Sequence, residues 1–202
     1  MKEFIVFISS PSDVEDERKI ISKVIDEINW YYEPIKGIPK LKPISSEDAR
    51  PKITNSHPQT VIDEQIDKYD LYLGIFGNKY GTPTEKYGSG TVHEFYNALE
   101  KLNEDPKAIE ISVYFSTQLP TNKNEANMND LLKIEKFKEE ISGKGLYKEY
   151  ESIDKFEEMI RRHLRSFILE KSSVLIEEDY EDKFDERIGE YLEILTDEIS
   201  KI

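Results

Sequence analysis

The sequence predicts an α/β protein in which a mostly parallel sheet is covered by helices on both faces. Two observations support this fold class. Short continuous apolar runs, such as DLYLGIFG at residues 70–77, are typical of strands that are buried on both faces. These runs alternate with segments whose apolar residues recur at the 3.6-residue spacing of an amphipathic helix, and strand and helix alternate about five times.

The first part of the chain shows this alternation directly. Residues 3–8 (EFIVFI) are a predicted strand, and the polar stretch from Ser9 to Asp13 ends it and offers N-cap oxygens to the next helix. That helix carries acidic residues in its first turn and is expected to end before Pro34. The second strand, residues 41–46, contains Pro43, which lacks an N–H donor, so we expect this strand at an edge of the sheet.

The later elements follow the same order. Pro58 suits the first turn of a second helix, and the strand at 70–77 leads through a Gly- and Ser-containing loop into a third helix. Residues 109–115 are a fourth strand and residues 145–150 a short fifth one. Between them lies a helix from about Asn129 to Ile141, and a last helix of the domain begins after Ser152. The inward side chains predicted for the helix at 129–141 are Leu132, Phe137 and Ile141.

The charge distribution divides the chain into an α/β domain, residues 1–171, and an acidic extension, residues 172–202. The extension holds eleven acids and three bases, so it contributes −8 of the formal charge of −14. An apolar line with helical spacing runs through Phe184, Ile188, Leu192, Leu195 and Ile199. The extension is therefore a predicted amphipathic helix, which either packs on the domain or acts as a connector or oligomerisation helix.

Composition excludes several classes of function. A chain of 202 residues with a charge of −14 repels nucleic-acid backbones and anionic lipid, although specific binding of one nucleotide is compatible with it. The absence of cysteine excludes disulfide scaffolds, thiolate zinc sites and a cysteine nucleophile. With only three histidines, a multi-histidine metal centre is not expected.

The sequence offers neither a secretion signal nor a membrane span. The apolar run in MKEFIVFISS is short and is followed at once by polar residues, so it is interpreted as the first strand. No stretch approaches the roughly 20 apolar residues that a membrane span needs. We therefore expect a soluble, cytoplasmic protein.

Three polar loops are expected at the carboxyl end of the sheet, where open parallel sheets bind ligands. They are residues 9–13, 45–57 and 77–91, and none contains the glycine-rich patterns of nucleoside triphosphatases or dinucleotide-binding folds. The first loop suits a phosphate or a ribose, but ordinary helix capping by Ser12 or Asp13 is the more common use of such residues. Arg18 either pairs with Glu15 or reaches this loop.

The start of the third helix contains the main candidate residue, Glu94. Thr91 and Glu94 have the spacing of a capping box, which is the structural interpretation. The functional alternative is a carboxylate directed into the crevice at the ligand end of the sheet. His93 lies about 100° away around the helix, so a His93–Glu94 dyad is not expected. Asn78 and Tyr80, with the glycines of the same loop, form an aromatic-bearing rim.

Several strings together resemble a known family. FISSPSDVEDER, DLYLGIFGNKYG, GTVHEFYNAL and YKEYESIDKFEEMIRRHL occur in the same order across about residues 3–168. They are similar to the TIR-like family called domain of unknown function 4062, a relative of Toll/interleukin-1 receptor (TIR) domains. The resemblance implies a flavodoxin-like, five-stranded sheet and, in many bacterial and plant TIR relatives, cleavage of the nicotinamide–ribose bond of NAD.

The resemblance also assigns roles to residues of this chain. Glu94 matches the essential glutamate on the helix after the third strand, and the loop at 46–56 matches the segment that gates the pocket. Ser9 and Ser10 match the pocket floor. By location, Asp13 and Asn78 are further candidate substrate-binding residues, as are Tyr80 or Tyr87 for ring stacking and Arg50 or Lys52 for the pyrophosphate.

The resulting functional hypothesis is an NAD glycohydrolase or cyclase of bacterial anti-phage defence, with NAD as substrate and no cofactor or metal. One carboxylate suffices for this chemistry, because the departing nicotinamide needs no general acid. We expect activity after self-association, and the chain can be the front of a longer protein with a downstream domain. Two alternatives stay open: a non-catalytic assembly module, and a nucleoside deoxyribosyltransferase-like enzyme with Glu94 as nucleophile.

Overall fold

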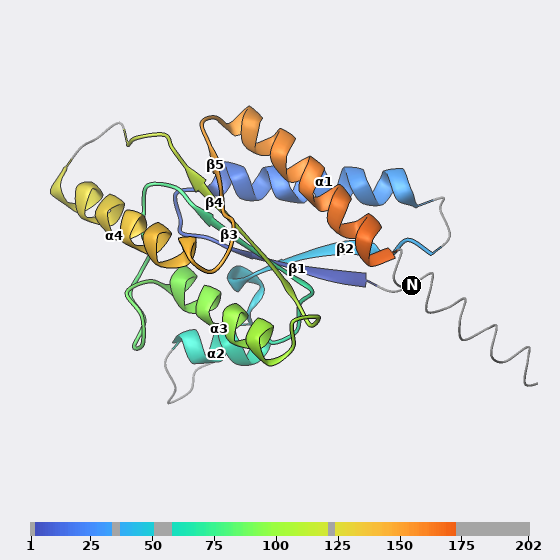
Figure 1. The fold of residues 1–202 in the computed structure, drawn as a ribbon, viewed down its shortest axis with the longest axis horizontal. Coiled ribbons are helices and arrows are strands. Elements are labelled where there is room, and N and C mark those ends of the chain that lie inside the picture. The colour runs from blue at the N-terminus through green and yellow to red at the C-terminus, as the bar shows by residue number, and fades with distance from the viewer. Residues whose placement is uncertain (1–2, 34–36, 51–57, 121–123, 173–202) are drawn as a thin grey trace, which may run out of the picture.

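The computed structural model describes residues 3–33, 37–50, 58–120 and 124–172. Within them five strands form one sheet in the order β2-β1-β3-β4-β5, and every neighbouring pair is parallel (Figure 1). This order is the flavodoxin-like one, so the predicted fold class is confirmed. The strands are β1 (Glu3–Ser9), β2 (Lys40–Ser45), β3 (Leu71–Phe76), β4 (Glu110–Ser116) and β5 (Lys148–Tyr150).

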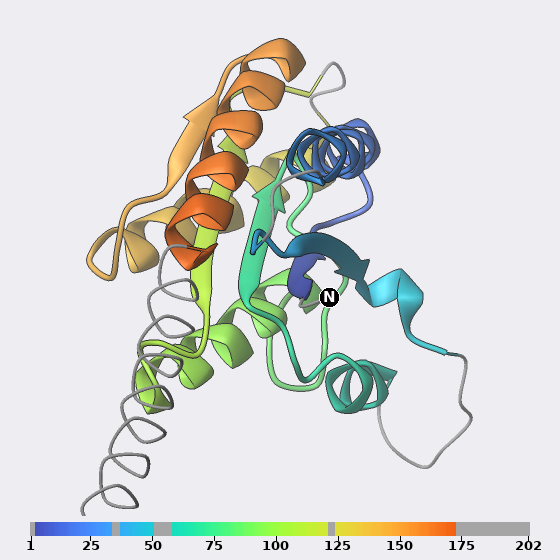
Figure 2. The same cartoon turned by 90° about the vertical axis from the view of Figure 1, so that its right-hand side faces the viewer.

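Helices cover both faces of the sheet, as expected. One face carries α1 and a helix over residues 153–172, which is drawn in orange, and the other face carries the remaining helices (Figures 1 and 2). The labelled helices are α1 (Glu15–Tyr32), α2 (Pro58–Gln65), α3 (Gly90–Glu104) and α4 (Glu125–Ser142). Each face has its own apolar core, and β3, whose six residues are all buried, contributes to both.

The two edges of the sheet differ. Strand β2 forms one edge and accommodates Pro43 opposite Val6, which confirms the prediction from the missing N–H donor. At the other edge β5 has three residues and pairs only with Tyr114–Ser116 of β4. Among the described residues, the first half of β4 is therefore paired on its β3 side alone.

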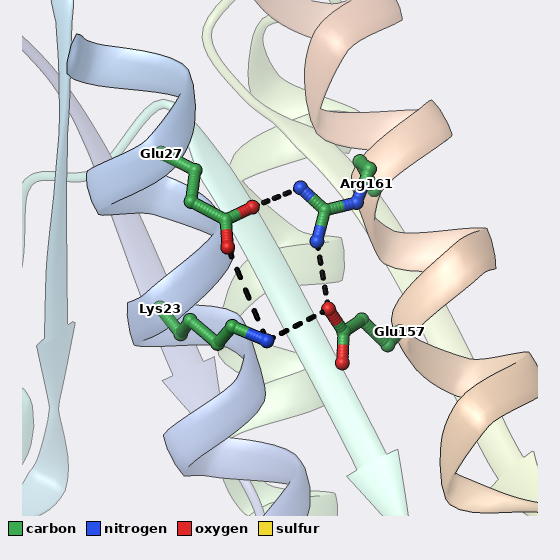
Figure 3. A network of polar contacts seen from close by, with 4 residues as sticks. All are labelled: Lys23, Glu27, Glu157 and Arg161. Atoms are coloured by element: carbon green, nitrogen blue, oxygen red, sulfur yellow. Dashed lines mark hydrogen bonds and ion pairs between the residues drawn. The ribbon is translucent and has the colours of Figure 1, made fainter.

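A network of charged side chains joins α1 to the 153–172 helix over their shared core (Figure 3). Lys23 Nζ lies 3.1 Å from Glu157 Oε1, and Arg161 contacts both Glu157, at 2.7 Å, and Glu27. These side chains are partly exposed, so their ion pairs contribute little to stability compared with the apolar core beneath them. Their pairing links two helices that run in the same direction (Figure 1).

Two predictions about helices are corrected by the structure. Helix α1 begins at Glu15, and its N-cap position is Val14, so neither Ser12 nor Asp13 caps it. Helix α4 is longer than predicted, and its inward residues are Ile134, Phe137 and Ile141, whereas Leu132 is 59% exposed. Among the helices in the described part of the chain, none combines the length and apolar character of a membrane span. The predicted acidic helix at 172–202 lies, after Ser172, outside the described residues.

Candidate functional site

A cleft of about 680 Å³ opens at the carboxyl ends of β1 and β3, the position where the strand order reverses. Its walls are the loop after β1, the start of α2, the long loop after β3 and the start of α3. The lining residues that carry polar side chains are Ser10, Ser12, Ser46, Gln59, Lys79, Thr82, Thr84, Thr91, Glu94 and Asp130. Parallel pairing brings these loops together although they lie far apart in the sequence.

Glu94 is the buried acid of this cleft, with 6% of its surface exposed. Its Oε2 accepts a hydrogen bond of 2.5 Å from the Ser9 hydroxyl at the end of β1. Its Oε1 accepts one of 3.3 Å from Gln59 Nε2 in the first turn of α2. Three elements therefore fix the carboxylate in one orientation, and Glu94 also borders a second cavity of about 250 Å³ between α2 and α3.

Burial raises the pKa of the Glu94 carboxyl to about 7, because the charged form loses its hydration. The hydrogen bonds from Ser9 and Gln59 lower this pKa, and the negative charge of Asp63 raises it further. Near neutral pH the protonated and ionised forms are both present. Such a shift at a cleft is typical of residues that take part in chemistry.

The capping-box interpretation of Glu94 is wrong. Helix α3 begins at Gly90, and its N-cap is Ser89, whose Oγ accepts from the Val92 N–H at 3.4 Å. Thr91 therefore lies inside the helix and cannot form a box with Glu94. The Glu94 carboxylate is directed to Ser9 and Gln59 instead, so a capping role does not explain its presence.

His93 points away from Glu94, as the helical spacing predicts. Its Nδ1 lies 3.2 Å from Thr84 Oγ1, and its Nε2 lies 3.2 Å from Asp63 Oδ2. The ring of Tyr87 packs edge-on against the imidazole and also stacks on Tyr96. Tyr87 is thus part of an aromatic cluster beside the cleft.

The loop after β1 is held from α1. Arg18 Nη1 donates to Ser10 Oγ and to the Pro11 carbonyl oxygen, both at 3.0 Å. Of the two uses predicted for Arg18, the structure shows the one that reaches the loop, while Glu15 pairs with Lys19. Ser9 and Ser10 are therefore both at the cleft, Ser9 bound to Glu94 and Ser10 half-buried on its wall.

Asp13 connects two of the cleft loops. Its Oδ2 accepts hydrogen bonds from the Asn78 N–H at 2.6 Å and the Lys79 N–H at 3.0 Å. Lys79, which the loop thus positions, lines the cleft, and its Nζ lies 3.3 Å from Ser12 Oγ. Asp13 therefore holds the loop at 77–79 in place by these two hydrogen bonds.

Replacing Gly77 by alanine is expected to break this connection. A Cβ at position 77 would lie 2.5 Å from Asp13 Oδ2 and 2.8 Å from Val14 Cγ1, both of which are held in place. We expect the free energy of unfolding to fall by about 1–3 kcal/mol, measured by urea denaturation. Gly143→Ala is the control, since no described atom lies within 4 Å of its Cβ position. Equal stability of the two variants would contradict this role for Gly77.

Three further residues that the sequence predicted to bind substrate are not among the described residues that line the cleft. Arg50 is exposed, and its backbone is bonded by the Gln65 side chain. The ring of Tyr80 lies 5.7 Å from Lys133 Nζ. The amide oxygen of Asn78 is buried and has no hydrogen-bond partner among the described residues. Lys52 and the gating segment after Arg50 fall outside the described residues.

Sequence reasoning missed two residues of the cleft. Gln59, which donates a hydrogen bond to Glu94, follows Pro58 at the start of α2. A polar residue at the start of a helix that follows a cleft loop could have been predicted to face the cleft. Asp130 lines the cleft from α4, and no local pattern indicates it. In the described part of the chain, no group of three or more His, Asp or Glu side chains is arranged to hold a metal ion.

Comparison with protein families gives one match, which covers most of the domain. The family described as Domain of unknown function (DUF4062) matches residues 5–165. Comparisons with curated proteins and with solved structures give no significant match. The relation to TIR domains inferred from the sequence strings is not part of this result and stays a prediction. The match over residues 5–165, on the parallel five-stranded fold described above, shows that the chain belongs to the DUF4062 family.

Proposed function

We propose that this domain cleaves the nicotinamide–ribose bond of NAD, with Glu94 as the catalytic carboxylate. The observation that carries the proposal is the geometry of Glu94, which is buried at the sheet-end cleft and bonded by Ser9 and Gln59. The TIR resemblance of the sequence strings supports the choice of NAD. Bacterial defence by depletion of NAD is the biological role that this activity favours.

The chemistry requires little more than one fixed carboxylate. The nicotinamide ring of NAD is cationic and leaves as a neutral molecule, so no acid has to protonate it. The ribose then carries oxocarbenium-like positive charge, which an ionised Glu94 stabilises from a position that needs no reorganisation. A water molecule gives hydrolysis, and an adenine nitrogen of the same substrate gives cyclisation.

The cleft also suits the rest of the dinucleotide. Its volume of about 680 Å³ is that of a cofactor-sized site. The hydroxyls of Ser10 and Ser12 and the ammonium of Lys79 lie on the wall formed by the first and third loops. These groups favour a pyrophosphate on that side, while Glu94 faces the ribose.

The first test is nicotinamide release from NAD across pH, at low and high protein concentration. Catalysis needs the ionised form of Glu94, whose pKa lies at about 7. We therefore expect the rate to rise about tenfold between roughly pH 6 and pH 8 and then to level off. Spontaneous hydrolysis of NAD without protein is the control.

Two outcomes would contradict the proposal, and each has a meaning of its own. No release at any protein concentration favours a non-catalytic assembly module. A stable sugar adduct on Glu94, seen by mass spectrometry with nucleoside substrates, favours glycosyl transfer with Glu94 as nucleophile.

A further inference from the structure

An apolar groove of about 360 Å³ lies at the β4 edge of the sheet, and it shares no lining residue with the cleft. Its floor includes Ile111 and Val113 of β4, and its walls come from the second half of α3 and the connection from α4 to β5. The apolar lining residues are Phe95, Leu99, Leu102, Pro106, Ile109, Ile111, Val113, Ile141, Leu146 and Tyr147. Leu146 is 92% exposed, so this surface presents apolar side chains to water.

The groove coincides with the half of β4 that β5 does not cover. β5 pairs with Tyr114–Ser116, whereas the described residues place no strand beside Glu110–Val113 on that side. An uncovered strand edge beside an apolar groove is a docking site for an extended segment, which would bind by backbone hydrogen bonds and by apolar side chains.

The sequence directly after the described part of the chain contains a segment of suitable composition. Lys171, near the end of the described part of the 153–172 helix, lines the groove. Val174, Leu175 and Ile176 follow within three to five residues, and three residues span at most about 10 Å. Two of these three residues are β-branched, which favours an extended conformation.

The charges at the groove and those of the segment after Ile176 are complementary. Among the described residues that line the groove, Lys144 and Lys171 are the basic ones and Glu110 is the one acid. Directly after Ile176 come Glu177, Glu178 and Asp179, the start of the acidic extension. Once the apolar run occupies the groove, these carboxylates are close to the two lysines.

We propose that the groove at the β4 edge binds residues 174–176 of the same chain. The acidic extension is thereby anchored to the domain at its first apolar residues, and the part beyond Asp179 stays available for other contacts. This inference does not depend on the proposed catalytic activity, since it concerns the opposite end of β4 from Ser116 and the cleft.

Disulfide cross-linking in the 202-residue chain tests the proposal, because these 202 residues contain no cysteine that could form a competing disulfide. Leu102→Cys with Leu175→Cys places one thiol in the groove and one in the segment. We expect an intramolecular disulfide at least about tenfold faster than in the control, because docking raises the effective thiol concentration. The control pair is Leu119→Cys with Leu175→Cys, since exposed Leu119 follows the other end of β4. Equal rates, or a cross-linked dimer in place of the intramolecular product, would overturn the proposal.

A second measurement uses single variants. Leu175→Asp should speed hydrogen exchange of the Ile111 and Val113 amides at least about tenfold, because these N–H groups face the uncovered edge of β4. The Glu110 N–H donates to the Asp70 carbonyl oxygen on the β3 side, so its exchange serves as an internal reference. The matched variant Leu195→Asp, further along the extension, should leave the exchange unchanged. Unchanged exchange in Leu175→Asp refutes docking even if the cysteine variants fold poorly, and equal acceleration in both variants refutes the assignment to residues 174–176.

Discussion

Glu94→Gln should reduce the rate of nicotinamide release from NAD by at least about 100-fold. Glutamine has nearly the shape of glutamate, and its amide oxygen can still accept the hydrogen bond from Ser9. The substitution therefore removes the negative charge, together with the oxygen that accepts the hydrogen bond from Gln59 Nε2. The loss arises in the transition state, where the developing positive charge on the ribose no longer faces a carboxylate, so kcat should fall more than KM changes.

Glu139→Gln provides the matched control. Glu139 is exposed on α4 and is not among the described residues that line the cleft. The substitution Glu139→Gln also removes one carboxylate. Equal losses of rate in the two variants would therefore indicate a general electrostatic cause. If the Glu94→Gln variant keeps more than about a tenth of the wild-type rate, Glu94 is not the catalytic carboxylate.

The second large effect concerns stability and needs no substrate. The pKa of Glu94 is about 7 in the folded protein, compared with the ordinary value of 4.5 that applies to a glutamate in the unfolded chain. Below pH 4.5 the group is protonated in both states, and as the pH rises towards 7 only the unfolded chain ionises. Glu94 therefore lowers the free energy of unfolding progressively over this range, by about 3 kcal/mol in total, and the loss is complete above the folded pKa.

Glu94→Gln should remove this pH dependence. The difference in unfolding free energy between the variant and the wild type is expected to shift in favour of the variant by about 3 kcal/mol from roughly pH 4.5 to pH 7.5. Urea denaturation at several pH values measures it, and other titrating groups cancel in the difference. Glu139→Gln, at an exposed position on α4, is the control variant for this measurement. A difference that is constant with pH would mean that Glu94 is not a desolvated carboxyl.

The fold was predictable from the sequence because its strongest signals are local. The strands β1 and β3 are continuous apolar runs and β4 is a mainly apolar one, while Pro43 alone indicates that β2 lies at an edge. Helix α4 shows the limit of such patterns. Its sequence offers apolar residues on more than one face, so periodicity could not decide that Ile134 is buried and Leu132 exposed. Packing against β3 and β4 decides it.

The site was predictable only in part, for a related reason. The position of Glu94 at the start of the helix after β3 follows from local sequence, and the approach of Ser9 follows from parallel pairing. Gln59 lies 35 positions before Glu94, and only the packing of α2 brings the two together. The capping box failed because Ser89, two residues before Thr91, is an equally good cap and is the one used.

Because α2 helps to bury Glu94, the ionisation of Glu94 and the attachment of α2 to the domain depend on each other. This helix has eight residues, and its Gln59 and Ile62 border the same cleft as Glu94. If α2 separates from the domain, water reaches the carboxylate and its pKa returns towards 4.5. Ionisation of Glu94 and detachment of α2 therefore promote each other, and whatever keeps α2 in place also favours the protonated acid. Among the described α-helices, the eight-residue α2 is the shortest, and its contact with the domain thus influences the charge of the buried Glu94.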